Sequence, residues 1–141
     1  MAERKGRRDR RFSRTVVVTI AVIVLLVAAG VTAKVIADRS AETRVEELTA
    51  EVDELLQGAS PRDFLAFNSG RSVPESVAKD VADAPDFVSV DARAERAVIR
   101  FQPKGWWAGF TERCVVAVVT DDEVRVLRPK TACVRVDPED Y

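Results

Sequence analysis

Two cysteines, Cys114 and Cys133, are the residues of this 141-residue chain whose chemistry is easiest to define. The chain has no histidine, and two thiols alone do not make a zinc site. Their separation is also far from the C-x-x-C spacing of redox centres. In an oxidising compartment the simplest outcome for such a pair is a disulfide, which we predict, and the alternative is two buried free thiols.

Carboxylates are plentiful, but their positions do not indicate an active site. Asp121, Asp122 and Glu123 are consecutive and could hold a hard cation or simply form a turn. The absence of histidine removes the commonest general base and metal ligand. The sequence also lacks a G-x-S-x-G elbow, a phosphate-binding loop and a Cys/His nucleophile pair. We therefore expect no enzyme activity, no cofactor and no metal.

The segment Pro103 to Phe110, PKGWWAGF, contains both tryptophans of the chain and three aromatic residues. It is a candidate binding loop for a glycan or a protein, or a loop that enters the headgroup region of a membrane. The structural alternative is that Trp106 and Phe110 close the end of a small core. Because consecutive residues of an extended segment point to opposite sides, we predict that Trp106 and Trp107 differ, one packing on a sheet and the other exposed.

A different class of function would use the same loop. In that alternative a small ligand-binding or enzymatic domain combines Trp106, Trp107 and Phe110 with the charged residues Lys104, Glu112 and Arg113.

The element that positions everything else is the uncharged stretch from Thr15 to Ala33. Its 19 residues would span roughly 28 Å as a helix, close to the ~30 Å hydrocarbon core of a bilayer. A cleaved secretory signal is an alternative, because a basic leader precedes the run and Val31-Thr32-Ala33 loosely fits a cleavage site; a signal's apolar region is usually shorter, about 7–15 residues. A buried core helix would need a larger protein around it. We predict a transmembrane helix.

Charge on the two sides of this span predicts its orientation. Residues 1–14 contain seven basic and two acidic residues, whereas residues 35–141 contain 14 basic and 21 acidic residues. The positive-inside rule then places the amino terminus in the cytoplasm and the rest outside. The leader is expected to contact anionic lipid and not nucleic acid. The 17 arginines against five lysines suggest a GC-rich genome and hence a bacterial envelope protein.

After the span, neither Gly nor Pro interrupts residues 31–57, so the helix is expected to continue into water. An apolar stripe runs along this continuation at Val45, Leu48, Val52 and Leu55. Three explanations are open: self-association as a parallel coiled coil, packing onto the chain's own domain, or a coil with another envelope protein. Gly58 fits the left-handed position after a helix, and Ser60 with Pro61 fits the start of the next.

The remaining residues predict an α+β domain. Short helices are expected from Pro61 and from Pro74 to about Ala82, the second capped by Ser72 and Glu75. Strands are then expected at 87–91 and 97–102 as a hairpin, at 114–119 as a buried strand, at 123–128 and at 132–136. The predicted organisation is a leader (1–14), a transmembrane helix (15–37), an amphipathic helix (38–58) and a domain (60–141) with a mostly antiparallel five-stranded sheet.

This layout of basic leader, apolar helix, polar helix and small sheet domain with a late disulfide resembles that of pilin-like proteins. The pilin cleavage signature is absent, since Gly6 is followed by Arg7, and residues 15–33 contain no acid. A bitopic division-type protein with a membrane-proximal coil is a similar comparison. Together the features predict a single-pass envelope protein whose outer domain is a non-catalytic interaction or structural module. Its expected partners are membrane lipid and either an envelope protein or a second copy of the chain.

Overall fold

The computed structural model describes the backbone of residues 3–68 and 77–141 and the side chains of residues 14–67 and 77–141. The chain forms two compact units, Met1–Ile36 and Ala37–Tyr141. One helix, α1 (Glu3–Leu55), contributes residues to both. The polar helix predicted as a separate stalk therefore belongs, from Ala37 onward, to the domain.

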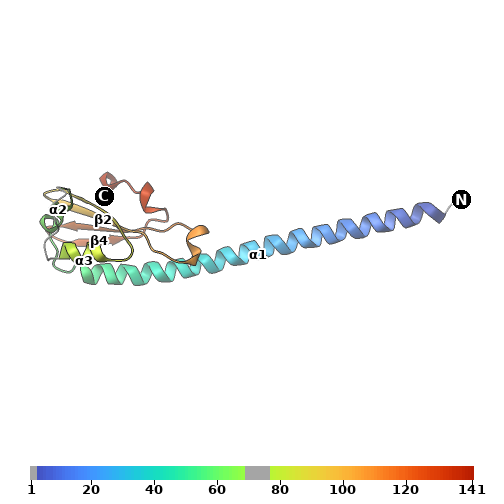
Figure 1. Cartoon of the computed structure of the whole chain (residues 1–141), viewed down its shortest axis with the longest axis horizontal. Coiled ribbons are helices and arrows are strands. Elements are labelled where there is room, and N and C mark those ends of the chain that lie inside the picture. The colour runs from blue at the N-terminus through green and yellow to red at the C-terminus, as the bar shows by residue number, and fades with distance from the viewer. Residues whose placement is uncertain (1–2, 69–76) are drawn as a thin grey trace. The chain divides into compact units, whose positions relative to one another are not determined.

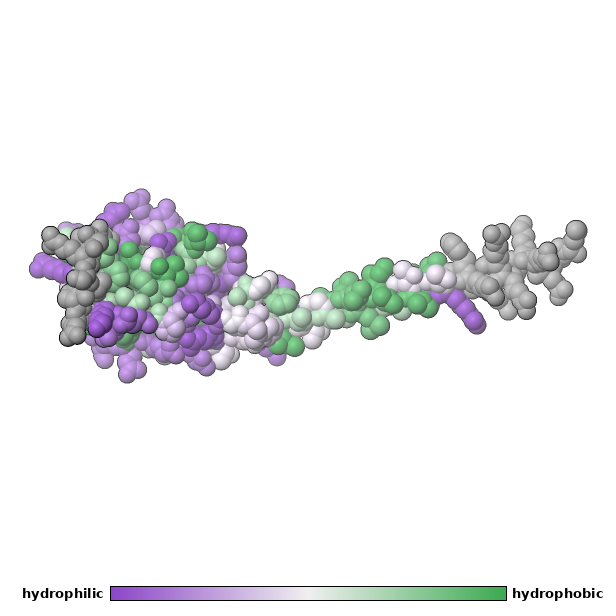
Figure 2. Space-filling view, viewed as in Figure 1, coloured by the Kyte–Doolittle hydropathy of each residue, from purple (hydrophilic) through white to green (hydrophobic). Residues whose placement is uncertain are grey.

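In the first unit, α1 presents its apolar side chains outward. Every valine, leucine and isoleucine from Val16 to Ile36 is exposed in the structure, and Figure 2 shows this part of the helix as a hydrophobic band. Among the described residues, α1 is the one helix long and apolar enough to cross a membrane. This is consistent with a single-pass membrane anchor.

In the second unit, one face of α1 is buried along the sheet (Figure 1). The buried residues along this face recur at spacings of four or three and are at most 4% exposed: Ala37, Ala41, Val45, Leu48 and Val52 of α1, and Leu56 directly after it. This spacing follows one side of a 3.6-residue helix. The structure therefore shows the apolar stripe packed onto the chain's own domain, which was one of the three explanations offered for it. Leu56 takes the fully buried place predicted for Leu55, which is only partly buried.

The described strands form one antiparallel sheet in the order β1-β2-β3-β4, with β1 at Phe87–Ala92, β2 at Arg96–Phe101, β3 at Val115–Thr120 and β4 at Val124–Leu127. The predicted hairpin is confirmed, since Arg93 N donates to Arg96 O across the β1–β2 turn at 2.7 Å. In the centre, Ala97 pairs with Val119 and Phe101 with Val115. The prediction of an antiparallel α+β domain is thus confirmed in its class.

The two faces of the sheet are covered by different parts of the chain. Ile99, Phe101 and Ala117 face α1 in the larger core, whereas Val98 and Val116 lie in a second cluster with Cys133 and Val136. Alternate residues of a strand point to opposite faces, so β3 is buried on both. A continuous apolar run is typical of such a strand, as the sequence indicated.

Short helices connect α1 to the sheet, namely η1 (Pro61–Phe64), α2 (Leu65–Asn68) and α3 (Val77–Asp83). Gly58, with φ of 79°, ends the α1 region in the left-handed conformation that was predicted for it. Ser60 caps η1: its Oγ accepts from Arg62 N at 3.2 Å, and Ser60 N donates to Asp63 at 2.8 Å. The predicted cap at Ser72 and Glu75 lies outside the described residues.

The fifth predicted strand, 132–136, is wrong. This segment forms the 3-10 helix η3 (Cys133–Arg135), followed by η4 (Pro138–Asp140). A strand would place Cys133 and Val136 on opposite faces, but both are buried against the sheet while Val134 is 85% exposed. Side chains satisfy the backbone here in place of a neighbouring strand: Gln102 accepts from Cys133 N, and Arg100 donates to Val136 O.

Candidate functional site

The aromatic loop after β2 is a turn of 3-10 helix, η2 (Trp106–Gly109), and not the extended segment that was expected. Ala108 N donates to Gly105 O at 3.1 Å, and Phe110 N donates to Trp107 O at 2.8 Å. Gly105 stands directly against the Trp107 ring: a Cβ added there would lie 2.3 Å from Nε1. The backbone of this loop therefore closes tightly around one indole.

The two tryptophans do differ, as predicted. Trp107 is 3% exposed and packs with Ala37 and Ala41 of α1, so it is buried against the helix and not on the sheet. Trp106 is 60% exposed and Phe110 is 55% exposed, which contradicts the alternative that these two residues close the core. Their rings lie edge to face, with centroids 6.2 Å apart. The pair forms an exposed aromatic surface on a loop that Trp107 fixes to α1.

Charged residues close to this loop are engaged in holding the domain together. Arg113 is the centre of one set: its guanidinium lies 3.7 Å from Asp38 and 3.8 Å from Glu42 on α1. It also donates to Thr111 Oγ1 at 2.7 Å. Its side chain is 12% exposed, and its Nε is buried without a hydrogen-bond partner among the described residues. Arg113 thus links the end of the aromatic loop to the first turns of α1 in the domain.

The other charged residues of the proposed ligand site have similar structural contacts. Lys104 donates to the carbonyl of Pro85, and Glu112 pairs with Arg135 at 2.9 Å. None of these contacts arranges Lys104, Glu112 and Arg113 around a common space. The contacts of these three charged residues join elements of the domain to one another.

A second arginine, Arg44 of α1, fastens this helix to the loop before β1. Arg44 donates to Asp86 at 2.8 Å and to Glu51 at 3.1 Å, and it lies 3.5 Å from Glu47. The hydrogen bond to Asp86 is the main cause that raises the pKa of Arg44. Asp86 is only 4% exposed, so this pair is a partly buried anchor that sequence analysis missed. The one local signal for it is Asp86 directly before an apolar strand.

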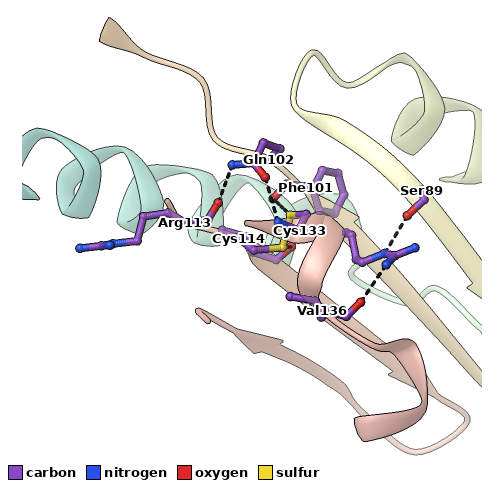
Figure 3. The surroundings of a disulfide bond; sticks show 9 residues. Ser89, Phe101, Gln102, Arg113, Cys114, Cys133 and Val136 are labelled. Atoms are coloured by element: carbon purple, nitrogen blue, oxygen red, sulfur yellow. Dashed lines mark hydrogen bonds between the residues drawn. A yellow bond between two sulfur atoms is a disulfide. The ribbon is translucent and has the colours of Figure 1, made fainter. Parts of the chain in front are cut away.

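The predicted disulfide between Cys114 and Cys133 is present, with Cα atoms 5.0 Å apart. It joins the start of β3 to η3 (Figure 3). Gln102 bridges the same place, since its amide donates to Arg113 O at 2.7 Å and accepts from Cys133 N at 2.9 Å (Figure 3). The bond therefore pins the carboxyl-terminal segment over the second face of the sheet.

The remaining candidates carry less chemistry. Asp121, Asp122 and Glu123 form the β3–β4 turn, in which Thr120 N donates to Glu123 O at 2.9 Å. In the described part of the chain, no group of three or more His, Cys, Asp or Glu is placed to hold a metal ion. A cavity of about 550 Å³ lies at the β1–β2 turn, which sequence analysis did not single out; its lining residues are Arg93, Ala94, Glu95, Arg96 and Thr120. No residue of η2 lines it.

Comparison of the chain with protein-family models, with curated proteins and with solved structures found no match.

Proposed function

We propose that this protein is a single-pass protein of a bacterial cell envelope, with its amino terminus in the cytoplasm and its carboxyl-terminal domain outside. In this proposal the domain catalyses no reaction and binds another envelope protein. The observation that carries it is α1 itself, because the helix with the apolar segment also supplies the core stripe of the domain. The charge difference across the apolar segment supports the orientation.

The charged contacts support an interaction module over a ligand-binding one. Arg44, Arg113 and Glu112 are used to join elements of the domain to one another. By contrast, apolar side chains stand on its surface, and Val134 at 85% is the most exposed of them. Its neighbour Cys133 is fixed by the disulfide, so Val134 is held on a short, constrained segment. A fixed apolar side chain loses little conformational freedom when a partner covers it.

Orientation is tested by cysteine labelling in intact cells. A Glu95→Cys variant places a thiol on the exposed β1–β2 turn, and a Ser13→Cys variant places one in the leader. A membrane-impermeant maleimide should label the first in intact cells and the second only after lysis. The reverse pattern would refute the orientation, and release of the protein from membranes by alkaline carbonate would refute the anchor.

Partner binding is tested by site-specific photocrosslinking in native membranes. A benzoylphenylalanine at Val134 should form one discrete adduct with another membrane or envelope protein. Benzoylphenylalanine at Glu95, an exposed position on the β1–β2 turn, is the matched control and should not form this adduct. Equal adducts from both positions, or none from Val134 and from the exposed Val88, would contradict the interaction module.

The pilin-like alternative shares the layout of the parts, which here are one helix with an apolar segment and a segment packed on an antiparallel sheet, and a disulfide. Residues 15–33 contain no acid and Gly6 precedes Arg7, so the signature that accompanies this layout is missing. Shearing of cells separates the two proposals, because a filament subunit would be released in polymers and an anchored module would stay with the membrane.

A further inference from the structure

We propose that the exposed aromatic surface formed by Trp106 of η2 and by Phe110, the residue directly after η2, lies in the lipid headgroup layer on the outer side of the membrane. The proposal rests on the membrane anchor proposed above. It adds a second contact between the protein and the bilayer, made by the domain and not by the transmembrane helix.

The first step is the reach of the chain. Trp107 packs on Ala37 and Ala41, which are among the first residues of the domain. Ala37 follows the apolar segment's last residue, Ala33, by four positions. This is about 6 Å if the four residues are helical, and at most roughly 14 Å if they are extended. The headgroup layer on each side of the hydrocarbon core is about 5–8 Å thick, so covalent connection alone keeps Ala37 in or beside it.

The second step is the position of η2 within the domain. η2 follows the carboxyl end of β2, whereas the β1–β2 turn lies at the opposite end of that strand. The part of the domain that packs on its earliest helical residues is therefore the η2 end. Trp106 adjoins Trp107 in the chain, so its Cα lies about 3.8 Å from that of the buried residue. The exposed aromatics are thus fixed at the end of the domain that is closest along the chain to the span.

The third step is the chemistry of the surface. Tryptophan is enriched at membrane interfaces because its ring is apolar and its N–H can still bond to water or headgroups. From residue 104 to 110 the only charge is that of Lys104, a cation, which suits anionic lipid. The carboxylates that flank the loop are paired with arginines: Asp38 and Glu42 with Arg113, and Glu112 with Arg135. Pairing reduces the repulsion that these acids would exert on an anionic headgroup layer.

A lipid surface explains the loop better than a protein partner does. The exposed apolar contact is small, consisting of two aromatic rings beside Ala108 and Gly109, and a stable protein interface needs about 800 Å² on each side. A membrane contact needs no such area, because the anchor already holds the loop at high effective concentration near the bilayer. The two contacts together would restrict how the domain rotates and tilts on its anchor.

The test uses the full chain in phosphatidylcholine vesicles, with and without lipids that carry bromine on the acyl chain near its carbonyl end. The chain has two tryptophans, so the Trp106→Phe variant reports Trp107 alone, and the difference from the wild type reports Trp106. The matched control is Trp106→Phe with Glu95→Trp, which moves the reporter to the exposed β1–β2 turn. Bromolipid should quench the Trp106 signal at least threefold more than the Glu95→Trp signal. Protection of the β3 amides from hydrogen exchange in each variant shows that the fold is kept.

Equal quenching at the two positions would overturn the proposal. So would protection of Trp106 from both bromolipid and aqueous acrylamide, which would assign the surface to a second copy of the chain. Resistance to alkaline carbonate is measured on the same vesicles. A resistant chain whose Trp106 is not quenched refutes the headgroup contact and leaves the anchor intact, whereas a chain extracted by carbonate refutes both.

Discussion

A single added methyl group tests how the aromatic loop is built. In Gly105→Ala the new Cβ would lie 2.3 Å from Nε1 and 2.8 Å from Cε2 of Trp107. Neither distance is tolerated without movement, and the indole is 3% exposed, so it cannot simply swing into water. The backbone at Gly105 is extended, with φ of 175°, so alanine brings no conformational strain of its own. The expected penalty therefore comes from steric overlap with Trp107.

The magnitude follows from overpacking of a filled site. Inserting a methyl group into a close-packed core costs about 1–3 kcal/mol, which corresponds to an opening equilibrium about 5-fold to 140-fold more favourable. Gly109→Ala is the matched control, because an added Cβ there has nothing within 4 Å. Its effect should stay within about 0.5 kcal/mol, or roughly twofold.

Amide hydrogen exchange of the full chain in detergent measures the difference. The amides of β3 report opening of the domain, because this strand is buried on both faces. Exchange there should be accelerated in Gly105→Ala and almost unchanged in Gly109→Ala. Combining Gly105→Ala with Trp107→Leu removes the ring atoms that overlap, so the added cost of the alanine should largely disappear. The reasoning is refuted if both glycine variants behave alike, or if the cost of Gly105→Ala persists without the indole.

Three further outcomes follow from other contacts of the domain. Arg44→Met leaves the buried Asp86 carboxylate without its ion-pair partner and should destabilise the domain by about 2–4 kcal/mol, measured by denaturant unfolding. Adding Asp86→Asn should restore part of this stability, and no recovery in the double variant would argue against the pair. Reduction of the disulfide, which closes a separation of 19 residues, should cost about 3 kcal/mol in the same assay, and an unchanged midpoint would show that the carboxyl-terminal segment is held without it. A cysteine at Val52 should cross-link between chains no more readily than one at the exposed Glu47, because Val52 is covered by its own domain; preferential cross-linking at Val52 would instead indicate exchange of α1 between copies.

The parts of the fold that could be predicted are those specified by local sequence. The hairpin, the left-handed Gly58 and the cap at Ser60 each depend on a few neighbouring residues, so the pattern and the structure agree. The buried β3 was readable for the same reason, as an apolar run bounded by polar residues. The strand predicted at 132–136 was wrong because alternation of apolar and polar residues over five positions also occurs in a helical turn. In this turn Cys133 N bonds to the Gln102 side chain and Val136 O bonds to the Arg100 side chain.

What the sequence left open is the identity of whatever covers an apolar surface. The stripe of Val45, Leu48 and Val52 requires a partner, yet the same spacing suits a second helix or a sheet, and only the tertiary structure shows that Ile99 and Ala117 cover it. One of the two tryptophans was expected to pack on the sheet, but the buried one, Trp107, packs on Ala37 and Ala41, two small residues of α1 that leave room for an indole. That contact buries Trp107, whereas Trp106 and Phe110 form the exposed aromatic surface of the loop. As with the stripe, the sequence does not say what covers this surface. Bromolipid quenching of Trp106 tests directly whether lipid covers it.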